Sequence, residues 1–276
     1  MINGDLKRIA ARDHLPAPLG TAAPYGRWLS VLIIALTALE GRADTIGSDA
    51  DVQGRNLAIR LLDQRPTENF TATGVLTIRS AAGEKMELPA KLTTTITATN
   101  WQNDYQAGGT NEVFLLTILH AKGLPDVYYY HTNLLTSASS SPAHPPLQGV
   151  ETSVPFAESD FWVGDLGVQF LQWPRQRVLK KEIKRSRGCA VLESTSPGQS
   201  GKGYSRVVSW IDTESGGIVQ AKAYDPDGQL LKEFYPKDLK KVNGQWQVGM
   251  MEMDNDQTGS RTRLEFDLGP ATLPKK

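Results

Sequence analysis

The chain has 276 residues, of which 39% are hydrophobic, and its 30 basic side chains are balanced by 30 acidic ones. This content is typical of a soluble globular protein with one large domain or two small ones. The balanced charge gives no general electrostatic argument for nucleic-acid binding, and the single cysteine, Cys189, excludes an intrachain disulfide. Because Cys189 lies in an apolar strand pattern, we interpret it as a small buried side chain and not as a reactive thiol.

An export signal is predicted at the N-terminus. Residues 28–39 form an uncharged apolar run, preceded by Arg27 and followed by a small-x-small sequence at residues 41–43. This is the layout of a secretory signal peptide, and the run is shorter than the roughly 20 residues that span a bilayer as a helix. We therefore expect a signal peptide with a long leader at residues 1–43 and a periplasmic domain at residues 44–276, with an uncleaved membrane anchor as the alternative. That domain has a net charge of about −2 and no lipid-accepting cysteine at its start.

The elements that follow are mostly strands. Residues 51–65 carry apolar side chains on a helical period before Pro66, which predicts an amphipathic helix. Short runs rich in aromatic and β-branched residues come next, separated by turn residues. They predict strands at residues 70–79, 86–99, 101–106, 112–120, 126–132, 177–184, 187–193, 204–212, 217–224, 229–235, 246–253 and 262–268.

Two segments between the strand groups differ from the rest. Residues 137–155 are rich in serine and proline, which predicts a long mobile loop within one domain. Residues 161–173 predict a short aromatic-rich helix, capped by Ser159 and Asp160 and ended by Pro174. Because about 10–12 antiparallel strands in one sheet favour curling, we expect a mainly β (α+β) fold, with an open barrel and this helix across its mouth.

Several aromatic and aliphatic side chains are candidates for a ligand wall. Residues 113–119 and much of 127–130 are apolar on both faces, which indicates cover on both sides or one face that lines a cavity. The candidate wall consists of Phe114, Leu116, Ile118, Tyr128, Tyr130, Trp162, Phe170 and Trp173. The alternative is that these side chains form the ordinary core between sheet and helix.

A basic segment at residues 175–187 is a second candidate surface. Its positive side chains include Arg175, Arg177, Lys180, Lys181 and Lys184. They are candidates for docking on lipid headgroups or on an acidic partner. The alternative is a solvated strand face whose charges prevent edge-to-edge pairing.

The sequence favours a protein that is not an enzyme and that holds no cofactor or metal. The histidines of residues 44–276 are His120, His131 and His144, which offer few candidate bases. Residues 198–203 lack the Ser or Thr after Lys202 and the glycine spacing of a phosphate loop. The aspartates at 225–227 and 254–256 lack the distal glutamate of a helix-flanked calcium loop, so we interpret them as turn residues. A hydrolase of envelope lipid or glycan is the weaker alternative.

A series of short motifs runs in order through the second half of the chain. The motifs are Glu158-Ser159-Asp160-Phe161, Asp165-Leu166, Arg187-Gly188-Cys189-Ala190-Val191-Leu192-Glu193, Tyr204-Ser205-Arg206, Trp210-Ile211-Asp212, Tyr224-Asp225, Asp227-Gly228, Leu231-Lys232, and a closing pattern of Met251-Glu252-Met253, Asp256, Thr258-Gly259 and Thr262. In this order and spacing they resemble the bacterial outer-membrane lipoprotein-sorting family, in its LolA-like branch (LolA/LolB-type fold). The best match covers residues 160–268.

The resemblance implies a half-open antiparallel barrel with a helical lid over an apolar cavity that takes acyl chains. It implies a periplasmic carrier without chemistry of its own, loaded by an inner-membrane transporter and unloaded at an outer-membrane receptor. We therefore expect a carrier or chaperone for lipoprotein acyl chains or a similar amphiphile, acting as a monomer and without nucleic acid. The alternative is a non-carrier envelope interaction protein whose barrel core is filled by its own side chains.

Overall fold

The computed structural model describes residues 48–134, 145–198, 202–242 and 245–269. The predicted signal peptide lies outside these ranges. Of the predicted loop at residues 137–155, residues 137–144 lie outside them and residues 145–155 are described. Within the described part of the chain, no helix has the length and apolar character that a membrane span requires.

A single antiparallel sheet contains the twelve strands of the described residues. The strands are β1 (Phe70–Arg79), β2 (Lys85–Ile96), β3 (Asn100–Gly108), β4 (Glu112–Ala121), β5 (Val127–Leu134), β6 (Arg175–Lys184), β7 (Arg187–Thr195), β8 (Arg206–Asp212), β9 (Ile218–Tyr224), β10 (Leu230–Val242), β11 (Gln245–Asn255) and β12 (Arg261–Phe266). Each predicted strand is present, so the mainly β prediction is confirmed.

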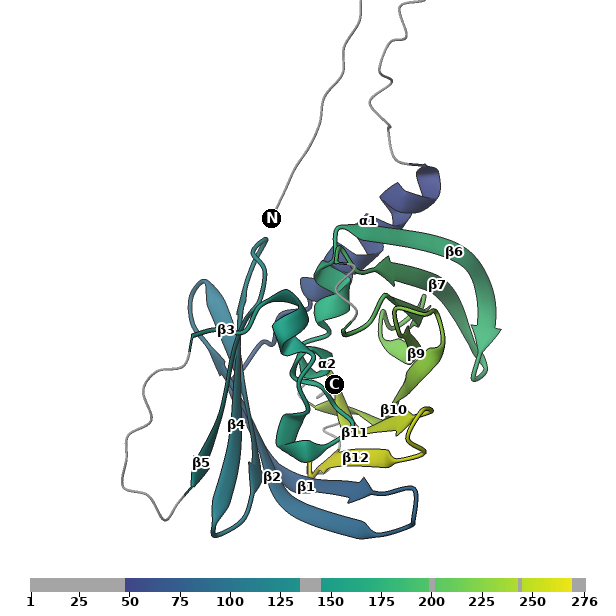
Figure 1. The fold of residues 1–276 in the computed structure, drawn as a ribbon. Helices are drawn as coiled ribbons and strands as arrows, with labels where there is room; N and C mark the ends of the chain where they lie inside the picture. Colours follow the sequence, from purple (N-terminus) through teal and green to yellow (C-terminus); the bar gives the residue numbers. More distant parts are fainter. Residues whose placement is uncertain (1–47, 135–144, 199–201, 243–244, 270–276) are drawn as a thin grey trace, which may run out of the picture. The chain divides into compact units, whose positions relative to one another are not determined.

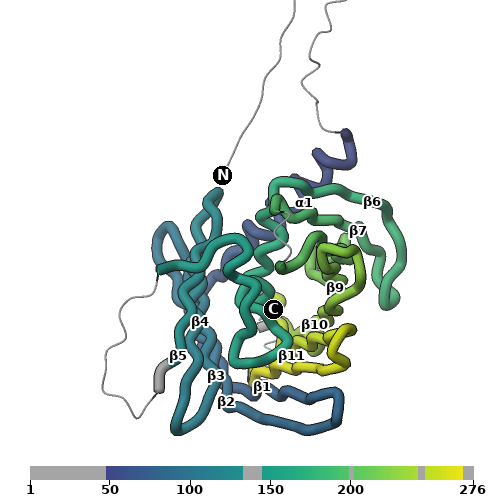
Figure 2. The backbone as a smooth tube through the Cα atoms, viewed as in Figure 1, coloured from purple at the N-terminus to yellow at the C-terminus, as the bar shows by residue number. Residues whose placement is uncertain are grey.

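The order of the strands is β5-β4-β3-β2-β1-β12-β11-β10-β9-β8-β7-β6. Two runs of sequential hairpins, β1–β5 and β6–β12, therefore meet where β1 pairs with β12. The sheet is strongly curved, and its outermost strands β5 and β6 do not pair with each other, so it stays open (Figure 1). The same curvature is visible in the backbone tube of Figure 2. This arrangement confirms the half-open barrel.

Strand β10 extends well beyond the predicted end at residue 235. The residue that follows, Pro236, lacks the N–H group that a central strand needs. In the structure β9 pairs with β10 only as far as Phe234, whereas β11 accompanies β10 to Val242. The second half of β10 is thus hydrogen-bonded to a neighbouring strand on one side only. A proline is tolerated in such an edge position.

Helix α1 (Asp49–Leu62) packs on the first half of β6. It starts at Ser48, whose backbone N–H and side-chain hydroxyl both donate to the Asp51 carboxylate. At Gly54 the helix approaches the β6 backbone so closely that a Cβ atom would lie 2.5 Å from the backbone nitrogen of Arg177. The predicted N-terminal helix is confirmed, with both ends two to three residues earlier than expected.

Residues 147–174, which we name the inner segment, lie within the concave side of the sheet (Figure 1). Its helical turns are η1 (Gly149–Thr152), η2 (Phe156–Glu158), α2 (Val163–Leu166) and η3 (Gln169–Gln172). The fully buried side chains of Phe156, Phe161 and Val163 pack in the main core cluster. There they join Leu76 of β1 and Leu264 of β12, the two strands that pair where the hairpin runs meet. The segment therefore supplies much of the core on the concave side.

The prediction of one capped helix over residues 161–173 is wrong in two respects. The helix is divided into α2 and η3 by Val168, which has a left-handed backbone with φ of 47°. Asp160 does not cap it, because the Asp160 carboxylate accepts a hydrogen bond from the Thr262 hydroxyl of β12. The polar residue before the aromatic run anchors the segment to the sheet instead.

Cys189 is buried on the other face of the sheet, next to Val191, Val208 and Trp210. Burial raises the pKa of its thiol, with a further contribution from the negative charge of Asp212. The interpretation of Cys189 as a small buried side chain is confirmed.

Candidate functional site

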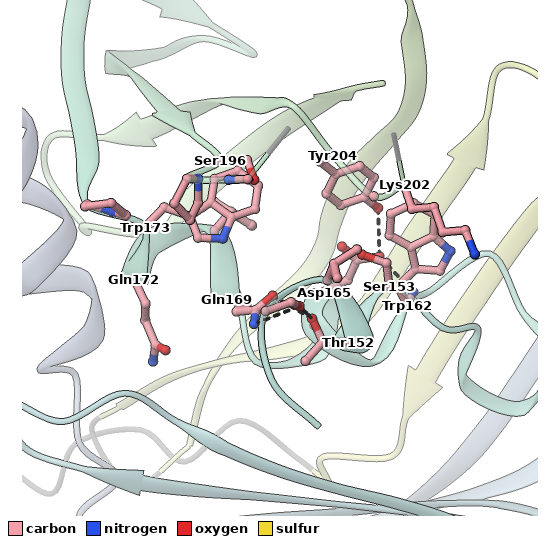
Figure 3. A pocket seen from close by; sticks show the side chains of 18 residues that line it. Thr152, Ser153, Trp162, Asp165, Gln169, Gln172, Trp173, Ser196, Lys202 and Tyr204 are labelled. Carbon is pink, nitrogen blue, oxygen red and sulfur yellow. Dashed lines mark hydrogen bonds between the residues drawn. The ribbon is translucent and has the colours of Figure 1, made fainter. Parts of the chain in front are cut away.

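A cavity of about 430 Å³ opens between the inner segment and the connection from β7 to β8 (Figure 3). This volume falls within the roughly 300–1,000 Å³ that small-molecule sites typically have. Its wall is formed by Gly149, Val150, Thr152, Ser153, Trp162, Gly164, Asp165, Gln169, Phe170, Gln172, Trp173, Pro174, Ser196, Pro197, Gly198, Lys202, Gly203 and Tyr204. Large aromatic rings and a few polar groups therefore face the same space.

The aromatic part of this wall is ordered by ring stacking. Trp162 and Tyr204 stack with their ring centroids 4.4 Å apart and an angle of 21° between the planes. Trp173 lies at the other end of the cavity, near Ser196 (Figure 3). Rings at both ends give the cavity rigid apolar surfaces that an aliphatic chain can contact.

A narrow gap of about 20 Å³ continues beneath the cavity toward the sheet. Asp165, Phe170 and Tyr204 belong to the walls of both spaces. The deeper wall is mostly apolar and comes from the concave face of the sheet, with Val207, Ala221, Ala223, Phe234 and Met253.

Lys232 of β10 is the cation at the base of this gap, and it is only 2% exposed. Its ammonium group donates a hydrogen bond of 2.6 Å to the backbone carbonyl of Asp160. The same group lies 3.6 Å from the centroid of the Trp162 ring and 3.9 Å from Asp165 Oδ2. One side chain of the sheet thus contacts three residues of the inner segment.

Asp165 completes this cluster. Its carboxylate accepts hydrogen bonds from the backbone N–H of Trp162 (2.8 Å) and from the Tyr204 hydroxyl (3.0 Å). Burial raises the pKa of Asp165, although the positive charge of Lys232 opposes this shift. Burial also raises the pKa of Tyr204, and it lowers the pKa of Lys232 to about 8.

Asp160 forms the second link between the inner segment and the sheet. Its carboxylate accepts hydrogen bonds from the hydroxyls of Ser260 (2.6 Å) and Thr262 (2.8 Å). The Thr262 hydroxyl in turn accepts a hydrogen bond from the Asp160 backbone N–H. Asp160 and Lys232 therefore hold the middle of the inner segment on the concave face.

The structure divides the predicted ligand wall into two groups. Leu116, Ile118 and Tyr128 are almost completely buried beneath the inner segment. Phe114 and Tyr130 are partly buried against the same cluster.

Trp162, Phe170 and Trp173 form the second group and line the cavity of Figure 3. That these side chains contact a ligand stays a prediction.

The predicted basic surface lies on β6, an outermost strand of the sheet. Arg175, Arg177, Lys180 and Lys181 are exposed, and Lys184 is partly buried with its ammonium group 4.5 Å above the Trp210 ring. Lys180 forms a 2.6 Å ion pair with Glu182 on the same strand. The role of this basic surface in docking stays a prediction.

Sequence reasoning did not select Lys232, Asp165 or Tyr204 as site residues, although all three belong to the motifs that carry the resemblance. One signal for Lys232 was available. It occupies an inward position of β10, two residues before Phe234, where an apolar side chain is expected. A charged residue at an inward position indicates a buried partner.

No cluster of three metal-ligating side chains is present in the described parts of the chain.

The chain was compared with protein families and with curated proteins. A family of uncharacterized proteins matches residues 146–268. No curated protein matches the chain significantly.

Three solved structures are similar over most of their length. A DUF1329 family protein from Desulfovibrio piger has a TM-score of 0.65 at 17% identity, and the match covers 83% of this chain and 96% of that one. A domain assigned to outer membrane lipoprotein sorting, from Vibrio parahaemolyticus, has a TM-score of 0.64 at 20% identity, with 82% and 95% covered. A LolA superfamily protein from Nitrosomonas europaea has a TM-score of 0.54 at 15% identity, with 81% and 94% covered. The chain thus has a LolA-like fold.

Proposed function

We propose that the protein is a periplasmic carrier that buries the acyl chains of a lipoprotein, or of a similar amphiphile, and helps to sort this cargo to the outer membrane. The observation that carries the proposal is the aromatic-lined cavity between the inner segment and the connection from β7 to β8. The LolA-like fold supports it, as does the similarity to a domain assigned to lipoprotein sorting. Such a carrier needs no chemistry of its own, since burying each methylene group contributes about 0.8 kcal/mol.

The inner segment acts as the lid in this proposal. The cavity and the deeper gap lie on either side of the Asp165, Phe170 and Tyr204 side chains. When the segment moves outward, Asp165 and Phe170 move with it and the concave face becomes available to an acyl chain. Lys232 and Asp160 hold the closed form, because each links the segment to the sheet.

The partners follow from the same proposal. An inner-membrane transporter would load the carrier and an outer-membrane receptor would unload it, while the protein itself stays monomeric in the periplasm. The basic surface of β6, with Arg175, Arg177 and Lys181 exposed, is the proposed docking face for lipid headgroups or an acidic partner.

A specific observation favours the alternative, a non-carrier envelope interaction protein with a filled core. Phe156, Phe161 and Val163 of the inner segment are at most 1% exposed and occupy the concave face themselves. If this packing is permanent, the concave face holds no cargo.

The test is native mass spectrometry of the protein purified from the periplasm without detergent, followed by solvent extraction and lipid identification. The carrier predicts reproducible adducts of acylated mass. The informative variant is Val150→Glu, because Val150 lines the cavity and is 45% exposed, so the charge enters the wall without disturbing the core. We expect this variant to lose most of the adduct.

The matched control is Val75→Glu on β1, since Val75 is 41% exposed and is not part of the cavity wall. This variant should keep the adduct. A clean mass for the unmodified protein, with no uptake of added lipid or acylated peptide, would favour the filled-core alternative.

A further inference from the structure

The distal part of the β10–β11 hairpin extends beyond the neighbouring strands of the sheet. Strand β9 pairs with β10 only as far as Phe234, and β12 pairs with β11 only from Met250 onward. Beyond these points β10 and β11 pair only with each other in the described part of the chain. Residues 237–242 and 245–249, which we name the ribbon, therefore form a two-stranded extension with two open edges.

One face of the ribbon carries apolar side chains that are open to solvent. Leu239 lies directly opposite Val248, and Trp246 is two residues before Val248, so the three side chains point to the same side. Leu239 is 39% exposed and Trp246 is 58% exposed. Among the described residues, the Trp246 indole has no hydrogen-bond or ring partner. A two-stranded hairpin by itself is at best marginally stable in water, so an uncovered apolar face here indicates an external surface that covers it.

The charged side chains of the ribbon are mainly positive. Lys237, Lys240 and Lys241 accompany one acidic residue, Asp238. Lys240 pairs with Asp238 at 3.1 Å, whereas Lys241 is exposed and has no acidic partner among the described residues. Because Lys241 lies directly opposite Trp246, an unpaired ammonium group and an exposed indole share one face.

We propose that the ribbon docks on an anionic lipid surface, with Trp246 in the headgroup region and Lys241 beside the lipid phosphates. Tryptophan suits this position because its ring is apolar and its N–H group is polar, and it is enriched at membrane–water interfaces. Lysines near an anionic leaflet add an attraction that salt weakens.

The same lysines disfavour a second copy of the chain as the occupant, because two ribbons face to face would bring like charges together. Docking through the ribbon does not depend on whether the cavity of Figure 3 holds cargo, since the ribbon contributes no residue to the wall of that cavity.

The experiment is co-sedimentation of the protein, purified from the periplasm, with vesicles of phosphatidylcholine alone and of equal parts phosphatidylcholine and phosphatidylglycerol. We expect binding to the anionic vesicles that decreases at high salt. Trp246→Ala should weaken this binding about tenfold or more, as the loss of a large apolar side chain from the interface predicts. Lys241→Gln should weaken it about fivefold, which is the effect of one lysine near an anionic surface.

Two variants outside the ribbon are the matched controls. Leu124→Ala removes an apolar side chain that is 65% exposed, and Lys91→Gln removes an exposed lysine of β2. Both should bind the vesicles as the wild type does. All variants share the same N-terminal residues, so differences among them report on the substituted positions.

A second measurement uses vesicles of brominated lipids, which quench the fluorescence of an indole in the headgroup region. Trp246→Phe keeps an apolar ring, so it should retain most of the binding and lose part of the quenching. Quenching that is unchanged in Trp246→Phe would place Trp246 outside the lipid and overturn the proposal.

Three further results would also overturn it. Equal vesicle binding by the wild type and Trp246→Ala would mean that the ribbon does not contact lipid. Binding that survives Trp246→Ala and is lost in Lys181→Gln would assign the lipid contact to the basic surface of β6. A dimer in light scattering that Trp246→Ala converts to a monomer would show that a second copy of the chain covers the ribbon.

Discussion

Lys232 is a residue whose burial must be compensated by specific partners. Its ammonium group has left water and is stabilised by the Asp160 carbonyl, the Trp162 ring and the Asp165 carboxylate. A buried charge pair of this kind contributes little net stability, but removing one member leaves the other charge unpaired. The interactions of Lys232 therefore mainly fix the position of the inner segment on the sheet, and they add little to the stability of the fold.

We expect Lys232→Met to lower the free energy of unfolding by about 3 kcal/mol or more, because Asp165 would remain buried without its counter-charge. The double variant Lys232→Met with Asp165→Asn should recover part of this loss. Urea denaturation of the wild type, both single variants and the double variant measures the coupling. Strictly additive losses would contradict a direct interaction between the two side chains.

The lowered pKa of Lys232 also predicts a pH dependence. Its pKa is about 8 in the folded chain against a reference value of 10.5, so between these values the unfolded chain binds more protons. The free energy of unfolding therefore rises with pH in this window, by ~1–2 kcal/mol between pH 8 and 9.5. Lys232→Met should lack this rise, and parallel curves for the two proteins would contradict the prediction. Measurements should stop below pH 10, because buried tyrosines such as Tyr105, whose pKa is raised to about 12, act in the opposite direction above it.

At the scale of elements, the strands could be predicted and the inner segment could not. Strand β12 alternates exposed Arg261, Arg263 and Glu265 with buried Thr262 and Leu264, so its period of two is visible in the sequence. The inner segment has no such period, because its turns are shaped by the concave sheet around them. Its polar residues therefore resemble helix caps in the sequence, whereas Asp160 accepts a hydrogen bond from a strand about a hundred positions away.

The contact between α1 and β6 gives a prediction with an unusual sign. Glycine to alanine in a helix normally stabilises it by about 1 kcal/mol. At Gly54 the added methyl group would lie 2.5 Å from backbone atoms of Gln176 and Arg177, so we expect Gly54→Ala to destabilise the protein by about 1–3 kcal/mol. Gln53→Ala, at an exposed position of the same helix, is the control and should be near neutral. Thermal denaturation of both variants provides the measurement, and a higher melting temperature for Gly54→Ala would show that the helix can shift outward freely.

At the scale of the whole molecule, the open sheet leaves two outermost strands whose pairing must be controlled. Strand β6 carries exposed Lys180 and Lys181, together with Leu179 and Ile183, which are 45% and 79% exposed. Lysine on an outer strand discourages pairing with another copy of the chain. We therefore expect the basic surface to have a structural role, whether or not it also docks on a partner.

We expect the double change of Lys180 and Lys181 to Thr to promote self-association, because the apolar residues of β6 then lose their charged neighbours. The matched control changes Lys85 and Lys91 to Thr on β2, which pairs with β1 from Lys85 to Thr94 and also with β3 from Ala90 onward. Lys85 and Lys180 each form an ion pair with a glutamate two residues later, so the two variants lose comparable interactions. Light scattering after gel filtration should show larger species only for the β6 variant, and a monomer in both cases would leave docking as the better explanation of the charges.

The strand order also determines the sequence of events when the chain folds. Each neighbouring pair within β1–β5 and within β6–β12 is connected by a hairpin, whereas the β1–β12 pairing joins residues from opposite ends of the described chain. Local hairpins form quickly, whereas a contact that closes a long loop first costs chain entropy. The β1–β12 pairing, which we call the seam, is therefore expected to form last. Gly74 lies in this seam, where a Cβ atom would be 1.9 Å from the carbonyl oxygen of Glu265. Until that late step, two exposed half-sheets are present in the same polypeptide. The time needed to join them sets how long a newly synthesised chain is vulnerable to aggregation and proteolysis.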